Sequence, residues 1–204
     1  QEVDRGPDVE SLVGVLVGDA PHGLATPDDV TVPAFGDPPA AGLTEWADHD
    51  LILIDCPPTL GLLTVNALVA ADYALLSTQS QYFSLQGVEQ AMEVVDLARD
   101  SLNPDLELLG VVLNIANMRT KHARQTLDAL RERFGDKVFR SVIRQSIAYA
   151  ESAERAVPIL DYRPDRGQDY LSLSGEILRR LGNPDLLERL DELSVAIVPA
   201  GARA

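Results

Sequence analysis

The chain has little of several residue types, and each shortage narrows its class. Cys56 is the single cysteine among 204 residues, which excludes an internal disulfide and any metal or iron–sulfur site built from the cysteines of one chain. Aromatic residues make up only 5% of a sequence that is 46% hydrophobic, so aliphatic side chains must fill the core. No apolar run reaches the roughly 18 to 20 residues of a membrane-spanning helix, and no signal peptide is recognisable. These shortages predict a soluble, cytoplasmic protein.

Positive charge is also scarce, but it is concentrated in one stretch. The formal net charge is −15, yet the stretch from Arg119 to Arg144 holds eight basic residues and three acids. The only two lysines of the chain, Lys121 and Lys137, both lie in it. An evenly acidic protein would repel nucleic acid, whereas a local basic surface can bind it. The basic stretch is therefore the candidate surface for a polyanion.

The order of apolar and polar segments predicts an α/β fold with a mostly parallel sheet flanked by helices. Residues 1–48 are rich in proline and glycine and are expected to form an irregular, incomplete N-terminal portion, in which only 11–17 could be a short helix or strand. The core domain is expected at 49–182, and a C-terminal helix with a loose tail at 183–204. Strands are expected at 51–54, 73–76, 107–115 and 138–143, and helices at 61–71, 84–102, 121–134, 148–156, 168–181 and 185–193.

An acid follows the first of these strands. The continuous apolar run 51–54 indicates a strand buried on both faces, and Asp55 comes directly after it. In open α/β folds ligands bind at the carboxyl edge of the sheet, where an aspartate can hold a water of a Mg²⁺ shell. A strand that merely leads into a helix N-cap gives the same short pattern, so the segment alone leaves both readings open.

The residues after Asp55 resemble one family. Residues 55–68 (DCPPTLGLLTVNAL) resemble the Walker B region of the ParA/Soj partition ATPases, and residues 79–87 (QSQYFSLQG) resemble the segment that follows it. The resemblance extends over about residues 51–182. It implies a P-loop NTPase-like fold, ATP and Mg²⁺ as cofactors, and a homodimer formed around two ATP molecules. It also implies non-specific DNA binding by the ATP dimer, stimulation by a ParB-like centromere-binding partner, and a nucleoid-associated location. Cargoes in this family include chromosomes, plasmids and protein clusters, and the sequence does not choose among them.

The resemblance assigns roles to single residues. Asp55 would be the Walker B acid that holds Mg²⁺ through water, and Asn114 resembles an adenine-side residue at the end of a central strand. Arg144 stands where the family commonly has a proline near the adenine and is the second candidate for nucleotide binding. The candidate DNA-binding residues are Arg119, which resembles an arginine of the family, and its neighbours Lys121 and Arg124.

Two further arginines of the same predicted helix have a simpler explanation. Arg131 and Arg133 lie close in sequence to Asp128 and Glu132. Asp128 and Arg131 are three apart, and oppositely charged residues at that spacing are neighbours on a helix surface, while Glu132 is adjacent to both arginines in the sequence. We therefore expect these two arginines to pair with the acids rather than to bind DNA.

The sequence lacks the phosphate-binding loop of this family. Such an ATPase needs Lys-Gly-Gly-x-Gly-Lys-[Ser/Thr], whose backbone N–H groups cradle the phosphates, and no stretch of the 204 residues matches it. The fold is thus expected to lack the first βα unit, and this chain alone is not expected to hydrolyse ATP. It would be a fragment of an active ATPase, which a start at Gln1 favours, or a degenerate relative that binds DNA or a partner without nucleotide.

A MinD-type positioning ATPase is the remaining alternative. Proteins of that type end in a basic amphipathic helix that binds membranes. The last predicted helix here, 185–193, holds four acids and one arginine, and anionic lipid would repel it. We therefore expect no membrane partner.

Overall fold

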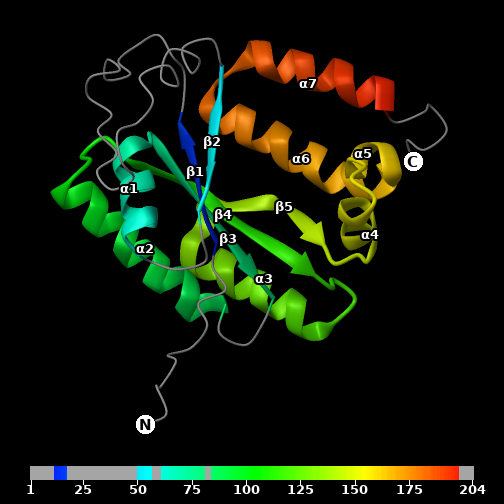
Figure 1. The fold of residues 1–204 in the computed structure, drawn as a ribbon. Helices are drawn as coiled ribbons and strands as arrows, with labels where there is room; N and C mark the ends of the chain where they lie inside the picture. The colour runs from blue at the N-terminus through cyan, green and yellow to red at the C-terminus, as the bar shows by residue number, and fades with distance from the viewer. Residues whose placement is uncertain (1–11, 18–49, 57–60, 81–83, 198–204) are drawn as a thin grey trace. The chain divides into compact units, whose positions relative to one another are not determined.

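The computed structural model describes residues 12–17, 50–56, 61–80 and 84–197 (Figure 1). Strands and helices alternate along most of these residues. In chain order they are β1 (Leu12–Val17), β2 (Ile52–Asp55), α1 (Leu62–Ala70), β3 (Tyr73–Gln79), α2 (Ser84–Ser101), β4 (Glu107–Ala116), α3 (Lys121–Phe134), a 3₁₀ turn η2 (Gly135–Lys137), β5 (Val138–Arg144), α4 (Ala148–Glu154), α5 (Ile159–Tyr162), α6 (Pro164–Leu181) and α7 (Pro184–Ile197).

The five strands form one sheet in the order β2-β1-β3-β4-β5. Strands β3, β4 and β5 are parallel, which confirms the predicted α/β class with parallel strands flanked by helices. The segment that the sequence left open between helix and strand is β1, and it pairs antiparallel with β2, Gly14 opposite Asp55 and Val17 opposite Ile52.

Burial corrects one prediction about the strands. β2 was expected to be buried on both faces, but its exposure alternates and Leu53 is 69% exposed. The strand that is buried on both faces is β4, in which Leu108 to Leu113 are all buried. A continuous apolar run shows that both faces of a strand could be covered, not that both are.

The chain divides into two compact units, and unit 1 contains residues 1–76 and 86–108. Its described core contains Leu68 of α1 and Val88 and Val95 of α2, all with no exposed surface. The end of α1 leaves backbone carbonyls without helical partners. Asn103, just after α2, donates from Nδ2 to the carbonyls of Leu68 (3.0 Å) and Ala71 (2.7 Å). This side chain thus ties α1 to the end of α2.

Unit 2 contains residues 77–85 and 109–204. Its core is built around Leu113, Leu130 and Phe139, which are fully buried. Helices α3 and α6 both pack against β5 and lie on opposite sides of it (Figure 1). The predicted bounds of α3 are confirmed, whereas α6 begins at Pro164 and not at 168, because a proline is well tolerated in the first turn of a helix.

Helix α6 is bonded to the outer side of β5 through charged side chains. The Glu176 carboxylate accepts hydrogen bonds from the backbone N–H groups of Arg140 (2.9 and 3.0 Å) and Ser141 (3.0 Å). Arg180, one turn further along α6, donates to the carbonyls of Asp136 (2.9 Å) and Val138 (3.2 Å). Polar backbone groups of β5 and of the 3₁₀ turn before it are therefore satisfied by this helix.

Arg180 also links the backbone of β4 to the turn that precedes β5. Its Nη1 donates to the carbonyls of Leu109 (2.8 Å) and Lys137 (3.0 Å), and its guanidinium lies 3.9 Å from the centroid of the Phe139 ring. A Cβ atom added at Gly110 would collide with Arg180 Nη1 and with the Lys137 carbonyl oxygen. Position 110 therefore requires glycine because the arginine and the neighbouring backbone occupy the space of a side chain.

The predicted division into 1–48, 49–182 and 183–204 stays a prediction. Most of the first portion lies outside the described residues. In the last portion, α7 continues to Ile197 and packs on α6, so it reaches beyond the helix that we expected at 185–193.

Candidate functional site

In unit 2, the ends of β3 and β4 meet at Asn114. Its Nδ2 donates to Ser77 Oγ at the end of β3 (3.3 Å), and its Oδ1 accepts from the backbone N–H of Ile115 (2.8 Å). Ile115 has a φ of 49°, a left-handed conformation that is uncommon for a β-branched residue and tends to occur at functional sites. The amide of Asn114 therefore has a defined orientation at the carboxyl end of the sheet, with one N–H and one lone pair left to bind a ligand.

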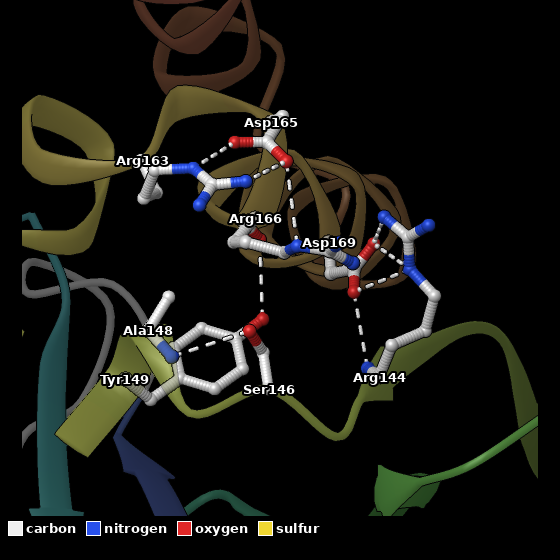
Figure 2. Close-up of polar contacts among 8 residues, drawn as sticks. All are labelled: Arg144, Ser146, Ala148, Tyr149, Arg163, Asp165, Arg166 and Asp169. Atoms are coloured by element: carbon white, nitrogen blue, oxygen red, sulfur yellow. Dashed lines mark hydrogen bonds and ion pairs between the residues drawn. The ribbon is translucent and has the colours of Figure 1, made fainter. Parts of the chain in front are cut away.

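Arg144 ends β5 at the same edge of the sheet, where its Cα is in register with that of Ala116. Its guanidinium binds Asp169 of α6: Nη2 donates to Oδ1 at 2.7 Å, and Nε donates to both carboxylate oxygens at 3.0 and 2.9 Å (Figure 2). The Asp169 side chain is 10% exposed and that of Arg144 is 46% exposed. The hydrogen bonds to Asp169 raise the pKa of Arg144, so the guanidinium is held as a fixed cation.

Two tyrosines lie next to this pair. The Tyr149 hydroxyl of α4 donates to the Arg166 carbonyl (3.1 Å) (Figure 2). The Tyr149 ring meets that of Tyr170 edge to face, with centroids 5.6 Å apart. Burial, followed by the charge of Asp169, raises the pKa of Tyr149 to about 12. The phenol therefore stays neutral and serves as a hydrogen-bond donor that links α4 to α6.

Ion pairs on the solvent side complete the start of α6. Asp165 accepts from Arg163 Nε (2.8 Å) and Nη2 (3.0 Å), and its carboxylate also lies 3.3 Å from Arg166 Nε (Figure 2). The hydrogen bond from Arg163 is the main cause of a lowered pKa of Asp165. The Arg163 and Asp165 side chains are exposed, and we assign this pair to the surface of α6 rather than to a binding site.

The candidate DNA-binding residues follow β4 on a tight turn. Asn117 Oδ1 accepts from the Arg119 N–H (3.2 Å), and the Thr120 hydroxyl donates to the Asn117 carbonyl (2.8 Å). Thr120 then caps α3 by accepting from the Ala123 N–H (3.2 Å). The turn places three exposed cations at the positive end of the helix dipole: Arg119, Lys121 and Arg124.

Asp55, the predicted Mg²⁺-binding acid, is exposed at the end of β2 in unit 1. Cys56 beside it is only 3% exposed, and burial followed by the charge of Asp55 raises the pKa of its thiol. Cys56 is thus a packed, protonated side chain, as its lone occurrence suggests. No three His, Cys, Asp or Glu side chains among the described residues gather as a metal site would require.

The structure brings some of the predicted residues together and adds others. Asn114 and Arg144 share the carboxyl end of the parallel strands in unit 2, where Gln145 N also donates to the Ala116 carbonyl (3.1 Å). Asp55 belongs to unit 1. Sequence reasoning missed Asp169. Its position among the buried residues of α6 is a usable signal, because a buried carboxylate requires a partner.

Similarity to known proteins covers much of the chain. A family model described as an AAA domain matches residues 45–108. The chromosome partitioning protein ParA of Myxococcus xanthus is 37% identical over 136 residues, which are 66% of this chain and 48% of that protein. The sporulation initiation inhibitor protein Soj of Bacillus subtilis is 39% identical over 132 residues, 64% of this chain and 52% of that protein. The chromosome partitioning protein ParA of Caulobacter vibrioides is 40% identical over 134 residues, which are 65% of this chain and 50% of that protein. The chain therefore spans about half the length of the curated relatives that it matches.

Solved structures show a weaker likeness. Cobyrinic acid a,c-diamide synthase from Mycobacterium smegmatis is 32% identical, with a TM-score of 0.45 over 56% of this chain and 50% of that chain. The same enzyme with bound ADP and magnesium gives 34% identity and a TM-score of 0.42 over 49% and 43%. Among the described residues, no helix has the length and apolar character needed to cross a membrane.

Proposed function

This chain is a relative of the ParA/Soj partition ATPases, and we propose that it contributes non-specific DNA binding to the segregation of a cargo. Arg119, Lys121 and Arg124 carry this function by contacting the phosphates of DNA. Their exposure at the start of α3, in a chain of net charge −15, is the observation that supports it most directly.

The physical state of these cations suits phosphate contacts. Within the described part of the chain, none of the three side chains makes an ion pair or hydrogen bond, so their charges are available to a ligand. The first backbone N–H groups of α3 and the helix dipole add positive potential at the same end. Contacts to phosphates need positive charge and reach but no base-specific geometry. The surface therefore fits DNA of any sequence.

The residues present fit only part of a Mg-ATP site. Asp55 offers one exposed carboxylate, and Asn114 offers a fixed amide at the end of β4. Arg144 has its Nε and one Nη2 N–H group committed to Asp169. No stretch of the 204-residue sequence has the glycine-rich motif of a phosphate loop. We assign no step of ATP hydrolysis to this chain.

We propose that DNA binding depends on nucleotide in a protein that has both a phosphate loop and the residues described here. Such a protein would bind Mg-ATP, form a homodimer, bind DNA in that state on the nucleoid, and respond to a ParB-like partner. The similarity to ParA and Soj sequences supports this proposal.

A second candidate function is DNA binding without nucleotide. The observation that favours it is the lack of the phosphate-loop sequence together with the availability of the α3 cations. On this alternative, affinity for DNA is indifferent to Mg-ATP and falls steeply with salt.

Fluorescence anisotropy with a labelled DNA duplex of random sequence tests both candidates. The 204-residue chain is titrated with and without Mg-ATP, beside the variants Arg119→Ala and Arg179→Ala. Arg179 is exposed on α6, and its loss changes the net charge by the same amount. We expect Arg119→Ala to weaken binding and Arg179→Ala to leave it nearly unchanged. Equal effects, or no binding by the parent chain, would overturn the proposal. Enhancement by Mg-ATP would favour the ATP-dependent function. Because this sequence lacks the phosphate loop, indifference favours the second candidate only if a longer chain that includes the loop is also indifferent.

A further inference from the structure

Helix α3 separates its residues into a buried and an exposed side. Ala123, Thr126, Leu127 and Leu130 are buried. With 3.6 residues per turn, positions 121, 124 and 131 fall within about 80° of each other, with 121 opposite the buried side and 131 about 90° from the centre of that side. Lys121, Arg124 and Arg131 are all exposed, so the cations at the start of α3 continue along its length.

The expected pairing of Arg131 with an acid is not found. Among the described residues, its guanidinium makes no ion pair or hydrogen bond with Asp128 or any other group. Arg133 differs in two respects. It is engaged by an interaction within the protein, and it lies roughly 200° further around the helix than Arg131. The two arginines that the sequence treated alike are thus separated by the structure.

We propose that Arg131 extends the DNA-contacting surface along α3, so that Lys121, Arg124 and Arg131 form one row of phosphate contacts. The proposal rests on the DNA binding proposed above. Lys121 and Arg131 lie ten positions apart, about 15 Å along the helix axis. This is enough for the cations to meet separate phosphates of a duplex, whose charges are about 3.4 Å apart along the axis on each strand.

The composition of this face favours DNA over a lipid surface. The exposed large hydrophobic residues of the described chain include none from α3, whereas helices that lie in membranes bury an apolar face. Asp128 lies on the same side as the row, between Arg124 and Arg131, and is exposed. Its carboxylate would lie close to the phosphates and weaken binding. Removing this negative charge should therefore strengthen DNA binding, whereas removing a cation of the row should weaken it.

The salt dependence of DNA binding measures each contact. Affinities of the full chain are measured between roughly 0.05 and 0.2 M salt for the parent, Arg131→Ala, Arg133→Ala and Asp128→Asn. We expect Arg131→Ala to reduce the slope of log K against log salt by about 1, and the affinity about 5- to 10-fold near 0.1 M salt. The matched control Arg133→Ala changes the net charge equally and should have little effect. Asp128→Asn should bind DNA more tightly than the parent.

The possible results distinguish a failure of the proposed Arg131 contact from a failure of the proposed DNA-binding function. If the parent chain does not bind DNA, the proposed function itself fails. If the parent binds and Arg119→Ala weakens it, but Arg131→Ala behaves like Arg133→Ala, the extension alone is wrong. Loss of binding to phosphatidylserine vesicles in Arg131→Ala, with DNA binding unchanged, would assign the face to a membrane instead. Urea unfolding of every variant confirms that it is folded.

Discussion

Asp169 binds Arg144 through both its side chain and its backbone. One carboxylate accepts from the guanidinium at 2.7 to 3.0 Å and from the Arg144 N–H at 3.0 Å. The end of β5 is thereby joined to α6 at the position where sequence similarity suggested a nucleotide contact. A role of Arg144 in nucleotide binding stays a prediction, while its role in holding these two elements together follows from the contacts.

Arg144→Ala should lower the free energy of unfolding by about 2 kcal/mol. The nearly buried Asp169 carboxylate would keep the backbone N–H but lose its charged partner. The loss is smaller than for a fully buried pair because Arg144 is half exposed. Urea denaturation measures the change. The control is Arg179→Ala, since the Arg179 side chain makes no ion pair or hydrogen bond among the described residues, and we expect this variant to stay within about 0.5 kcal/mol of the parent. Equal midpoints for the two variants would contradict the assigned role.

Gly110→Ala and Gly182→Ala should differ strongly in cost. At Gly110 the added methyl group meets a backbone oxygen and Arg180, whereas at Gly182 nothing lies within 4 Å and only the left-handed conformation, with a φ of 68°, is unfavourable. We expect a loss of about 2 to 4 kcal/mol for the first variant and about 1 kcal/mol for the second. Thermal and urea unfolding would show this order, and an equal loss in both would mean that Arg180 moves aside freely.

Glu176 should make the protein sensitive to acid. Burial pushes the pKa of Glu176 upward, but hydrogen bonds from the Arg140 and Ser141 amides outweigh it, and the net pKa is lowered. Stability from this group is then present above the unfolded-state pKa of about 4.3 and is lost as the pH falls through the lower folded-state value.

The comparison of Glu176→Gln with the parent at two pH values tests this sign. The parent should be more stable near pH 7, and the difference should shrink near pH 3 as the carboxylate becomes protonated. The exposed Glu154→Gln serves as control and should match the parent at both. A difference between parent and Glu176→Gln that grows towards low pH would refute the assignment.

Tyr149 should ionise unusually late. Since its pKa is raised to about 12, the fold favours the neutral phenol, and stability should fall as the pH rises from about 10 towards that value. The phenolate absorbance of the parent minus that of Tyr149→Phe isolates this ionisation. In urea-unfolded protein the same difference should be centred near 10. A folded-state midpoint near 10 would show that the hydroxyl is not enclosed between α4 and α6.

Local sequence signals were sufficient to predict the positions of most helices and strands. The bounds of α3 were predictable because Thr120 supplies an N-cap and Gly135 ends the helix. The burial of individual side chains was harder to predict from the sequence. Leu53 belongs to an apolar run but is exposed, because a run of residues does not reveal what covers them.

The site depended on contacts between distant residues. Asp169 lies 25 residues from Arg144 and Ser77 lies 37 from Asn114, and nothing in either local sequence specifies the partner. The left-handed φ of Ile115 is equally hidden, since isoleucine has no preference for that conformation. Family resemblance located the region, but the structure was needed to find which groups are already bonded.

The side chains of α6 also bear on how β5 meets other molecules. β5 is last in the strand order, and a strand in that position can template the addition of a strand from another chain. Here the N–H groups of Arg140, Ser141 and Arg144 are bound by carboxylates, and Arg180 binds nearby carbonyls. Helix α6 thus opposes edge-to-edge aggregation at β5, because its side chains already bind backbone groups that an added strand would need, in addition to covering the strand sterically.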